Sequence, residues 1–385
     1  MRLTTFTSTA LVATLVEARS TLTPRQAQPQ QQLIDVHHHF VPDFYGEGKL
    51  TVLADAIHSQ ASFNGSRSPV PSHSVAVDAA GGDPSGWPVP SWNISFDDAF
   101  SASLNITARI LSLTSPGAPI TGTNETTRAL ARRTNEFCAS LQEAQPSRVG
   151  CFAALPDLLD TNGTLAEIAY ALDELNADGV TLFTRYGDGN YYLGNPLFDP
   201  IWEELNARKA VVFIHPAAPV DHTLVNPFML QPLIDYPQET TRTAIDLITV
   251  RNRQRFPDTK VILSHAGGNL PWQFTRFAYS RRGVDVSLIA DNVTWDQAVS
   301  DLRSFYYDLA LSSSPEKLDL LLDLIPHDHL LYGSDFPYAP IAGVTNFYKA
   351  LDEYSFNSSE VRDQVFFGNA LDLLPRLANA IDSTN

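Results

Sequence analysis

Short apolar runs recur along this chain, and longer segments of helical periodicity separate them. Eight runs are read as strands, and the apolar runs at 210–214, 261–264 and 330–333 are read as strands buried on both faces. The expected strands are 33–39, 108–114, 149–155, 179–184, 210–214, 261–264, 305–311 and 330–333. The expected helices are 126–144, 165–176, 200–208, 239–255, 271–281, 315–324 and a C-terminal set within 346–380.

This alternation of strands and helices predicts an α/β fold, a (β/α)8 TIM barrel in a single domain over 33–385. An open doubly wound sheet is the alternative. Such a sheet would show a Gly-rich phosphate turn after the first strand, where this chain carries histidines instead.

Several of the expected strands end in a residue that can bind metal or transfer protons. The first ends in His37-His38-His39; alternation along a strand places His37 and His39 on one face and His38 on the other. Three later runs end in His215, His265 and Asp335. Because a barrel keeps its chemistry at the carboxyl ends of its strands, these side chains are expected to converge. A single such ending is usually a packing or capping residue, but four in order are hard to explain by packing.

A long insertion, residues 43–105, follows the first strand and interrupts this rhythm. Long loops in compact domains are usually functional or disordered. The segment holding Trp87 and Trp92 is stiff and aromatic, so we expect it to act as a lid or as one wall of a pocket for a flat apolar ring. Simple covering of the barrel mouth is an equally good interpretation.

Composition narrows the function classes. Of 385 residues, 44% are hydrophobic, and 26 basic and 43 acidic side chains give a net charge of −17. This balance argues against nucleic acid as a partner, because phosphate contacts need clustered Lys and Arg. An anionic substrate would be repelled at long range and would need a local cation, either a metal or an arginine.

The N-terminus predicts entry into the secretory pathway. Residues 1–18 resemble a signal peptide, 19–32 read as a disordered linker, and the apolar run is too short and polar to span a membrane. A cytoplasmic location is the alternative. There are seven N-glycosylation sequons, against about three expected by chance, at Asn64, Asn93, Asn105, Asn124, Asn162, Asn292 and Asn357.

The chain has two cysteines, Cys138 and Cys151, which fall in a helical and a strand-like pattern and are expected to be buried. Free thiols are the favoured expectation, because a disulfide scaffold would use more cysteines.

The motifs together resemble the metal-dependent decarboxylase branch of the amidohydrolase superfamily, which includes aminocarboxymuconate semialdehyde decarboxylase and γ-resorcylate decarboxylase. The resemblance rests on Asp35-Val-His-His-His-Phe-Val-Pro, Phe213-Ile-His-Pro, Leu263-Ser-His-Ala-Gly-Gly, Gly333-Ser-Asp-Phe-Pro and Gly368-Asn-Ala. Further stretches, such as Gly81-Gly-Asp-Pro-Ser-Gly-Trp, look closest to the 6-methylsalicylate decarboxylases of polyketide pathways. The predicted N-terminal signal is a departure from those enzymes.

The resemblance implies that His37, His39, His215 and Asp335 bind one divalent metal, with His265 beside it. Three imidazoles and a carboxylate suit Zn²⁺, and Mn²⁺ is the alternative. The implied reaction is non-oxidative decarboxylation of an ortho-hydroxybenzoate, with 6-methylsalicylate giving m-cresol and CO2. Asp335 is the candidate proton donor, and His265 would orient it, relay the proton or polarise the phenolic oxygen. Asp35 is expected to support the ligand pair. Relatives of this kind are often dimers, so a homodimer is one expected state.

The predicted substrate-side residues include two arginines and a glutamate. Arg185 follows the fourth strand and Arg242 follows the run Tyr236-Pro-Gln-Glu-Thr, so either could grip a carboxylate in bidentate fashion. A structural ion pair is at least as good an interpretation for each. Glu239 is a candidate partner of a ligating histidine and completes the substrate-side set with Trp87 and Trp92.

Two other functions compete with decarboxylation. A hydrolase of the same superfamily, acting on an ester, lactone or amide, would share nearly all ligands. Hydrolases with two metals often carry a carboxylated lysine on the fourth strand, and 179–184 has no lysine, which favours one metal. A binding protein that keeps only the fold is the third interpretation, and retention of all five site residues argues against it.

Overall fold

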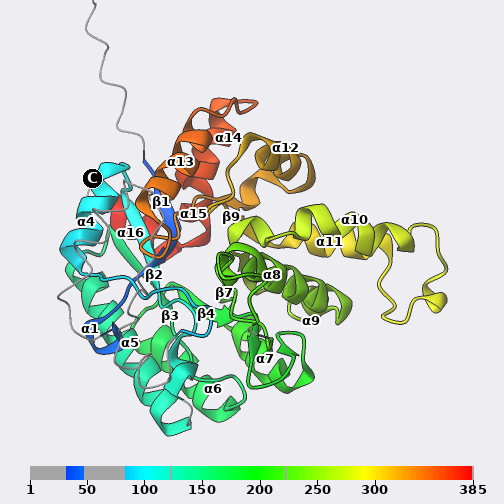
Figure 1. Cartoon of the computed structure of the whole chain (residues 1–385), viewed down its shortest axis with the longest axis horizontal. Helices are drawn as coiled ribbons and strands as arrows, with labels where there is room; N and C mark the ends of the chain where they lie inside the picture. The colour runs from blue at the N-terminus through cyan, green and yellow to red at the C-terminus, as the bar shows by residue number, and fades with distance from the viewer. Residues whose placement is uncertain (1–31, 47–82, 122–123, 222, 384–385) are drawn as a thin grey trace, which may run out of the picture. The chain divides into compact units, whose positions relative to one another are not determined.

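Eight parallel strands form the centre of the molecule in the computed structural model, which describes residues 32–46, 83–121, 124–221 and 223–383 (Figure 1). Their spatial order follows the chain, as expected when each strand is joined to its neighbour through a helix. The strands are β1 (Ile34–His39), β2 (Ala108–Ser112), β3 (Val149–Ala153), β4 (Gly179–Phe183), β7 (Val211–His215), β8 (Lys260–Leu263), β9 (Tyr306–Asp308) and β10 (Leu330–Leu331).

The last strand returns to the first and nearly closes the barrel. Val36 N donates to Tyr332 O at 3.0 Å, and His39 N donates to Phe336 O at 2.7 Å. A short antiparallel pair, β5 (Arg185–Tyr186) with β6 (Tyr191–Tyr192), lies outside the barrel sheet. The predicted (β/α)8 fold is therefore confirmed.

Helices lie between the strands and surround them (Figure 1). In the described part of the chain they are α1 (Asp43–Gly46), α4 (Ile94–Ser103), α5 (Asn124–Ala144), α6 (Thr161–Ala169), α7 (Asp199–Ala207), α8 (Gln231–Thr249), α9 (Asn252–Arg255), α10 (Leu270–Ala278), α11 (Trp295–Ser304), α12 (Pro315–Leu324), α13 (Ile341–Asp352), α14 (Ser359–Asp363), α15 (Asn369–Leu373) and α16 (Pro375–Asp382). None of these helices has the length and apolar character needed to cross a membrane.

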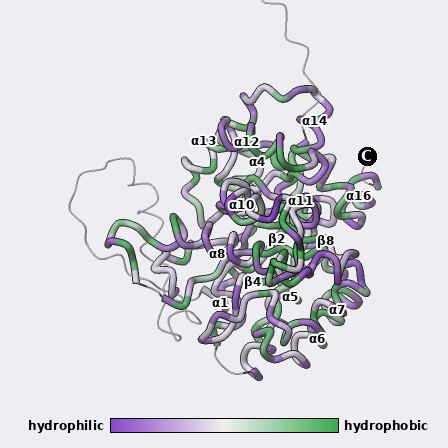
Figure 2. Tube along the Cα trace, turned by 90° about the vertical axis from the view of Figure 1, so that its right-hand side faces the viewer, coloured by the Kyte–Doolittle hydropathy of each residue, from purple (hydrophilic) through white to green (hydrophobic). Residues whose placement is uncertain are grey.

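The core has the two layers that the apolar runs predict. Inside the barrel, Val36, Ile110 and Phe213 are fully buried, and the outer faces of the strands pack against the helices. The tube in Figure 2 is accordingly hydrophobic along β2, β4 and β8 and more hydrophilic along the outer helices. All five residues of β2, β3, β4 and β7 are buried, as continuous apolar strands require.

Part of the insertion after β1 belongs to the core. Helix α4 begins after Asn93, whose side chain accepts a hydrogen bond from Phe96 N, and it buries Phe100 against the ring of Phe336 at 3.8 Å. Residues 47–82 lie outside the described residues, as do the predicted signal peptide and nearly all of the predicted linker. The lid role of the insertion stays a prediction.

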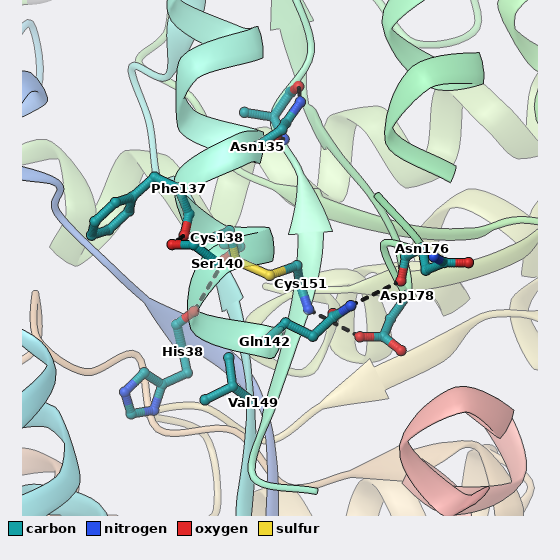
Figure 3. Close-up of a disulfide and its surroundings, with 12 residues drawn as sticks. His38, Asn135, Phe137, Cys138, Ser140, Gln142, Val149, Cys151, Asn176 and Asp178 are labelled. Atoms are coloured by element: carbon teal, nitrogen blue, oxygen red, sulfur yellow. Dashed lines mark hydrogen bonds between the residues drawn. A yellow bond between two sulfur atoms is a disulfide. The ribbon is translucent and has the colours of Figure 1, made fainter. Parts of the chain in front are cut away.

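The expectation of free thiols is wrong, because Cys138 and Cys151 form a disulfide (Figure 3). Helix α5 packs directly on β3 and brings the two Cα atoms to 6.1 Å, within the range that a disulfide needs. Both cysteines are buried, as predicted. Counting cysteines misled the prediction, since a large domain can use one cross-link between adjacent elements without being a disulfide scaffold.

Candidate metal centre and active site

The carboxyl ends of the strands bring together His37, His39, His215 and Asp335, whose ligand atoms all lie within 4.8 Å of one another. His37 and His39 end β1, His215 ends β7, and Asp335 follows β10. The two Nε2 atoms of the β1 pair are 3.1 Å apart, and Asp335 Oδ1 lies 3.5 Å from that of His37 and 3.2 Å from that of His39. This cluster could hold one metal ion.

Each of the three imidazoles is oriented by a partner at its other nitrogen. His37 Nδ1 lies 3.0 Å from Asp308 Oδ2, and His39 Nδ1 lies 2.9 Å from Ser112 Oγ. His215 Nδ1 lies 2.8 Å from the carbonyl oxygen of Pro216. With Nδ1 engaged, every ring leaves Nε2 for the shared point, which is the arrangement that ligating histidines show.

The electrostatics of the cluster also fit a cation. Burial, together with the other histidines, holds the pKa of His215 well below its ordinary value, and burial lowers the pKa of His39, so both rings stay in the neutral form that binds metals. Burial alone would lower the pKa of His37 too, but Asp308 and Asp335 outweigh it and raise that pKa to about 10. Positive charge is therefore stabilised at this point of the protein.

Asp308 is a site residue that the sequence analysis missed. Its Oδ2 pairs with His37, and its Oδ1 accepts backbone hydrogen bonds from His265 and Ala310 at 3.2 and 3.0 Å. It ends β9, so the rule applied to the other strand ends could have found it.

The loop after β10 runs against β1 because residue 333 is a glycine. A Cβ at Gly333 would lie 2.7 Å from His37 Cβ, closer than two such atoms can approach. This close approach lets Asp335 N donate to His37 O at 2.8 Å. Asp35 reinforces the junction, since its Oδ1 accepts from the backbone N of both His37 and Ser334.

Asp335 and His265 form a hydrogen-bonded pair beside the cluster, with His265 Nε2 at 3.3 Å from Asp335 Oδ2. Burial would raise the pKa of Asp335, but hydrogen bonds with His265, His37 and His39 hold it well below its usual range. Asp335 has a φ of 63° and His265 a φ of 54°. Positive φ is unusual for such residues and is typically retained where a site needs it.

A cavity of about 340 Å³ opens beside the pair, a size suited to a small ligand. His215, His265 and Asp335 form part of its wall, and aromatic and apolar side chains form much of the rest. Trp87 is one of them, with its Nε1 donating to Tyr338 O at 3.1 Å. From the described part of the insertion, Asp83, Ser85 and Trp87 line this cavity.

Four of the predicted substrate-side residues are not among the described residues that line this cavity. Arg185 donates to the carbonyl oxygens of Ala218, Gly187 and Gly189. Arg242 is exposed and donates to Tyr192 OH, which in turn donates to both carboxylate oxygens of Glu239. For the two arginines, the structural interpretation therefore fits better than a grip on the substrate.

Trp92, the fourth of them, is buried in a polar network on the far face of β1. Its Nε1 donates to Asp97 Oδ2 at 2.9 Å. The same carboxylate pairs with His38 Nε2 at 2.9 Å and with the fully buried guanidinium of Arg109 at 2.5 Å. His38 thus points away from the cluster, as strand alternation predicts, and Trp92 is not a wall of the cavity.

Comparison with known proteins places this fold and site in a family. A protein-family model described as amidohydrolase matches residues 34–376, and the chain belongs to that family. It is 42% identical to 6-methylsalicylic acid decarboxylase of Penicillium expansum over 349 residues, which cover 91% of this chain and 98% of that protein. It is 41% identical to 6-methylsalicylic acid decarboxylase acuB of Aspergillus aculeatus, over 90% of this chain and 97% of that one.

Solved structures agree on the fold. A dihydroxybenzoic acid decarboxylase from a Polaromonas species, with bound manganese and the inhibitor 2-nitroresorcinol, has a TM-score of 0.69. The match covers 90% of this chain and 97% of that chain at 20% sequence identity, so this likeness concerns the fold alone.

Proposed function

We propose that this chain is a metal-dependent decarboxylase that converts an ortho-hydroxybenzoate, 6-methylsalicylate above all, to a phenol and CO2. The observation that carries the proposal is the cluster of three Nε2-presenting histidines and Asp335 at the wall of a small, largely apolar cavity. The similarity to 6-methylsalicylic acid decarboxylases along nine-tenths of the chain supports the substrate.

The proposed metal ligands are His37, His39, His215 and Asp335. A bound divalent ion would anchor the oxygens of the substrate and stabilise negative charge that develops on them. Zn²⁺ is our first choice because three imidazoles and one carboxylate suit it, and Mn²⁺ is the alternative, which the Polaromonas decarboxylase carries.

The reaction needs one proton at the ring carbon. As the bond to the carboxyl carbon breaks, CO2 leaves and the ring carbon must receive a proton in its place. Asp335 Oδ2 and His265 Nε2, which are 3.3 Å apart, can share this proton, and both line the cavity. We assign Asp335 as the donor and His265 as the group that replenishes it. Trp87 and Tyr338 would pack along the apolar part of the ring.

A hydrolase is the second candidate. Its support is the ligand set alone, which hydrolases of this superfamily share. Strand β4 (Gly179–Phe183) contains no lysine that could bridge two metals, and both relatives described above are named as decarboxylases. The two candidates differ in product, since only decarboxylation releases CO2.

We also propose that the protein enters the secretory pathway and is glycosylated there. The disulfide supports this, because such bonds persist in oxidising compartments. Every sequon asparagine among the described residues is exposed, so a glycan at each could extend into solvent: Asn93, Asn105, Asn124, Asn162, Asn292 and Asn357.

The experiment is to purify the chain from a secreting host, measure bound metal, and incubate it with 6-methylsalicylate while following m-cresol and CO2. We expect about one metal ion per chain and equal amounts of the two products. Asp335→Asn should retain part of the metal and release no CO2. If the metal-loaded protein released acid from esters or lactones but no CO2 from hydroxybenzoates, the decarboxylase proposal would be wrong and the hydrolase would take its place.

A further inference from the structure

Lys317 is the one lysine or arginine among the described residues that line the cavity. The remaining charged side chains there, apart from the histidines, are the carboxyl groups of Asp83 and Asp335. In a chain of net charge −17, the proposed metal ion would attract an anion at the inner wall of this cavity, and Lys317 is the one lysine or arginine among the described lining residues that could attract it on the way there. Lys317 is therefore the side chain to examine for recognition of a carboxylate.

In the described part of the chain, no carboxylate forms an ion pair with the ammonium group of Lys317. Its Nζ donates to Ser312 Oγ at 3.2 Å, and Ser312 is itself buried in the cavity wall. Every other basic side chain discussed above has a carboxylate, phenol or carbonyl partner, but in the part of the chain that the structure describes Lys317 forms no ion pair. Its ammonium is left with donors available for a ligand.

The position of Lys317 in its helix points the same way. It lies in the first turn of α12 (Pro315–Leu324), the helix that follows β9. The helix macrodipole disfavours a cation at the N-terminal end, so the charge of Lys317 does not stabilise α12 through the dipole. Both effects, the unpaired charge and the unfavourable helix end, would be offset by an anion in the cavity.

Lys317 also lies where a ligand would enter. Its side chain is exposed to solvent while lining the cavity, and so is that of Leu233, which is 58% exposed. Pro340 is the third exposed residue among the described residues that line the cavity, and the opening lies among these three. A lysine is suited to this place because its flexible stem can follow an anion from solvent towards the interior.

We propose that Lys317 is a specificity-determining residue, which recognises the carboxylate of an aromatic acid at the mouth of the cavity and draws it towards the metal cluster. The role rests on the proposed function for the identity of the acid. It differs from the predicted grip by Arg185 or Arg242, whose hydrogen bonds engage other parts of the protein.

The test compares Lys317→Met and Lys317→Arg with wild type in the metal-loaded protein. Lys349→Met is the matched control because it removes the same charge. Lys349 is exposed on α13 and is not among the described residues that line the cavity. Binding of 6-methylsalicylate and of neutral m-cresol is followed by tryptophan fluorescence, since Trp87 lines the cavity.

For Lys317→Met we expect the dissociation constant of 6-methylsalicylate to rise about tenfold, the usual scale for one charged hydrogen bond. The dissociation constant of m-cresol should stay unchanged. Lys317→Arg should recover most of the affinity, and Lys349→Met should resemble wild type. In turnover, the loss should appear in KM with kcat retained, and added salt should weaken binding to wild type more than to Lys317→Met.

Equal loss of affinity for the acid and for m-cresol, or no loss for either, would overturn the proposal. The binding arm does not depend on turnover. If wild type bound aromatic acids through Lys317 but released no CO2, the decarboxylase function would fall while anion recognition stood. If Lys317→Met turned over the substrate normally at every substrate concentration, the decarboxylase function would stand and the role of Lys317 in anion recognition would fall.

Discussion

At the scale of single residues, the chemistry of this site depends on which nitrogen each histidine presents. A strand end can place an imidazole near a metal, but only a partner at Nδ1 fixes Nε2 as the ligand atom. The three partners here are a carboxylate from β9, a serine of β2 and a backbone carbonyl after β7. The carboxylate and the serine come from strands far from β1 in sequence, so they could not be read from the neighbours of His37 and His39, whereas the carbonyl belongs to Pro216, which directly follows His215.

Asp308→Asn tests this dependence. Two backbone N–H groups already donate to Oδ1, so the amide of an asparagine should keep its oxygen there and turn its NH2 towards His37. His37 would then have to accept at Nδ1 and carry its proton on Nε2, the wrong form for a ligand. We expect metal affinity to fall about 10–100-fold, measured as metal retained after dialysis against graded chelator.

Activity of Asp308→Asn should recover in excess metal, because the cavity and the Asp335–His265 pair are not changed directly. Asp323→Asn, an exposed substitution on α12, is the matched control and should retain metal like wild type. Undiminished metal retention in Asp308→Asn would show that the tautomer of His37 is not set by this carboxylate.

At the scale of elements, the apolar runs predicted all eight barrel strands, and α12 begins and ends where expected. The predicted start of α8 was wrong by eight residues, because Pro237 reads as a helix breaker. A proline inside a helix leaves the carbonyl four residues earlier without its partner, and here that residue, Leu233, is 58% exposed. Water can reach this turn, which lowers the cost.

The structure of the insertion after β1 could not be predicted from its hydrophobic pattern. Helix α4 buries Asp97 and Ser101 alongside Phe100, so its inward face is not an apolar stripe. The carboxylate of Asp97 is paired with His38, Arg109 and Trp92, which lie outside α4. The same holds for the substrate-side residues: the strand ends predicted the ligands, whereas the cavity wall depends on loops whose course the sequence pattern does not determine.

The link between α5 and β3 gives a prediction at this scale. Replacing both cysteines, Cys138→Ala with Cys151→Ala, should lower the free energy of unfolding by about 2–4 kcal/mol, because the cross-link restricts the unfolded chain. The thermal midpoint should fall by several degrees with metal content unchanged. Thiol reagents should find no free cysteine in the native protein, where both cysteines are buried, and none in unfolded, unreduced protein, where the disulfide still joins them. Two reactive thiols in the latter would contradict the disulfide.

At the scale of the whole molecule, the excess of acidic groups makes the free energy of unfolding depend on pH. The contribution of Asp83 to this dependence can be measured separately. Burial raises the pKa of Asp83 to about 6, although hydrogen bonds from Ser85 oppose it. In the unfolded chain the carboxyl titrates near its ordinary pKa of 3.8. Between these values the unfolded chain has lost the proton that the folded protein keeps, so stability falls as pH rises from about 4 to 6 and the loss is complete above that.

Asp83→Asn removes this titration while keeping an oxygen that can accept from Ser85 N. We expect the variant and wild type to be equally stable near pH 4, and the variant to be more stable by about 1–3 kcal/mol at pH 7.5, from the size of the pKa shift. Urea unfolding at a series of pH values measures the difference. A gap that is the same at pH 4 and pH 7.5 would mean that Asp83 titrates alike in both states. The ionised carboxyl also adds negative charge to the cavity that Lys317 lines, so above pH 6 the same group that costs stability opposes entry of an anionic substrate.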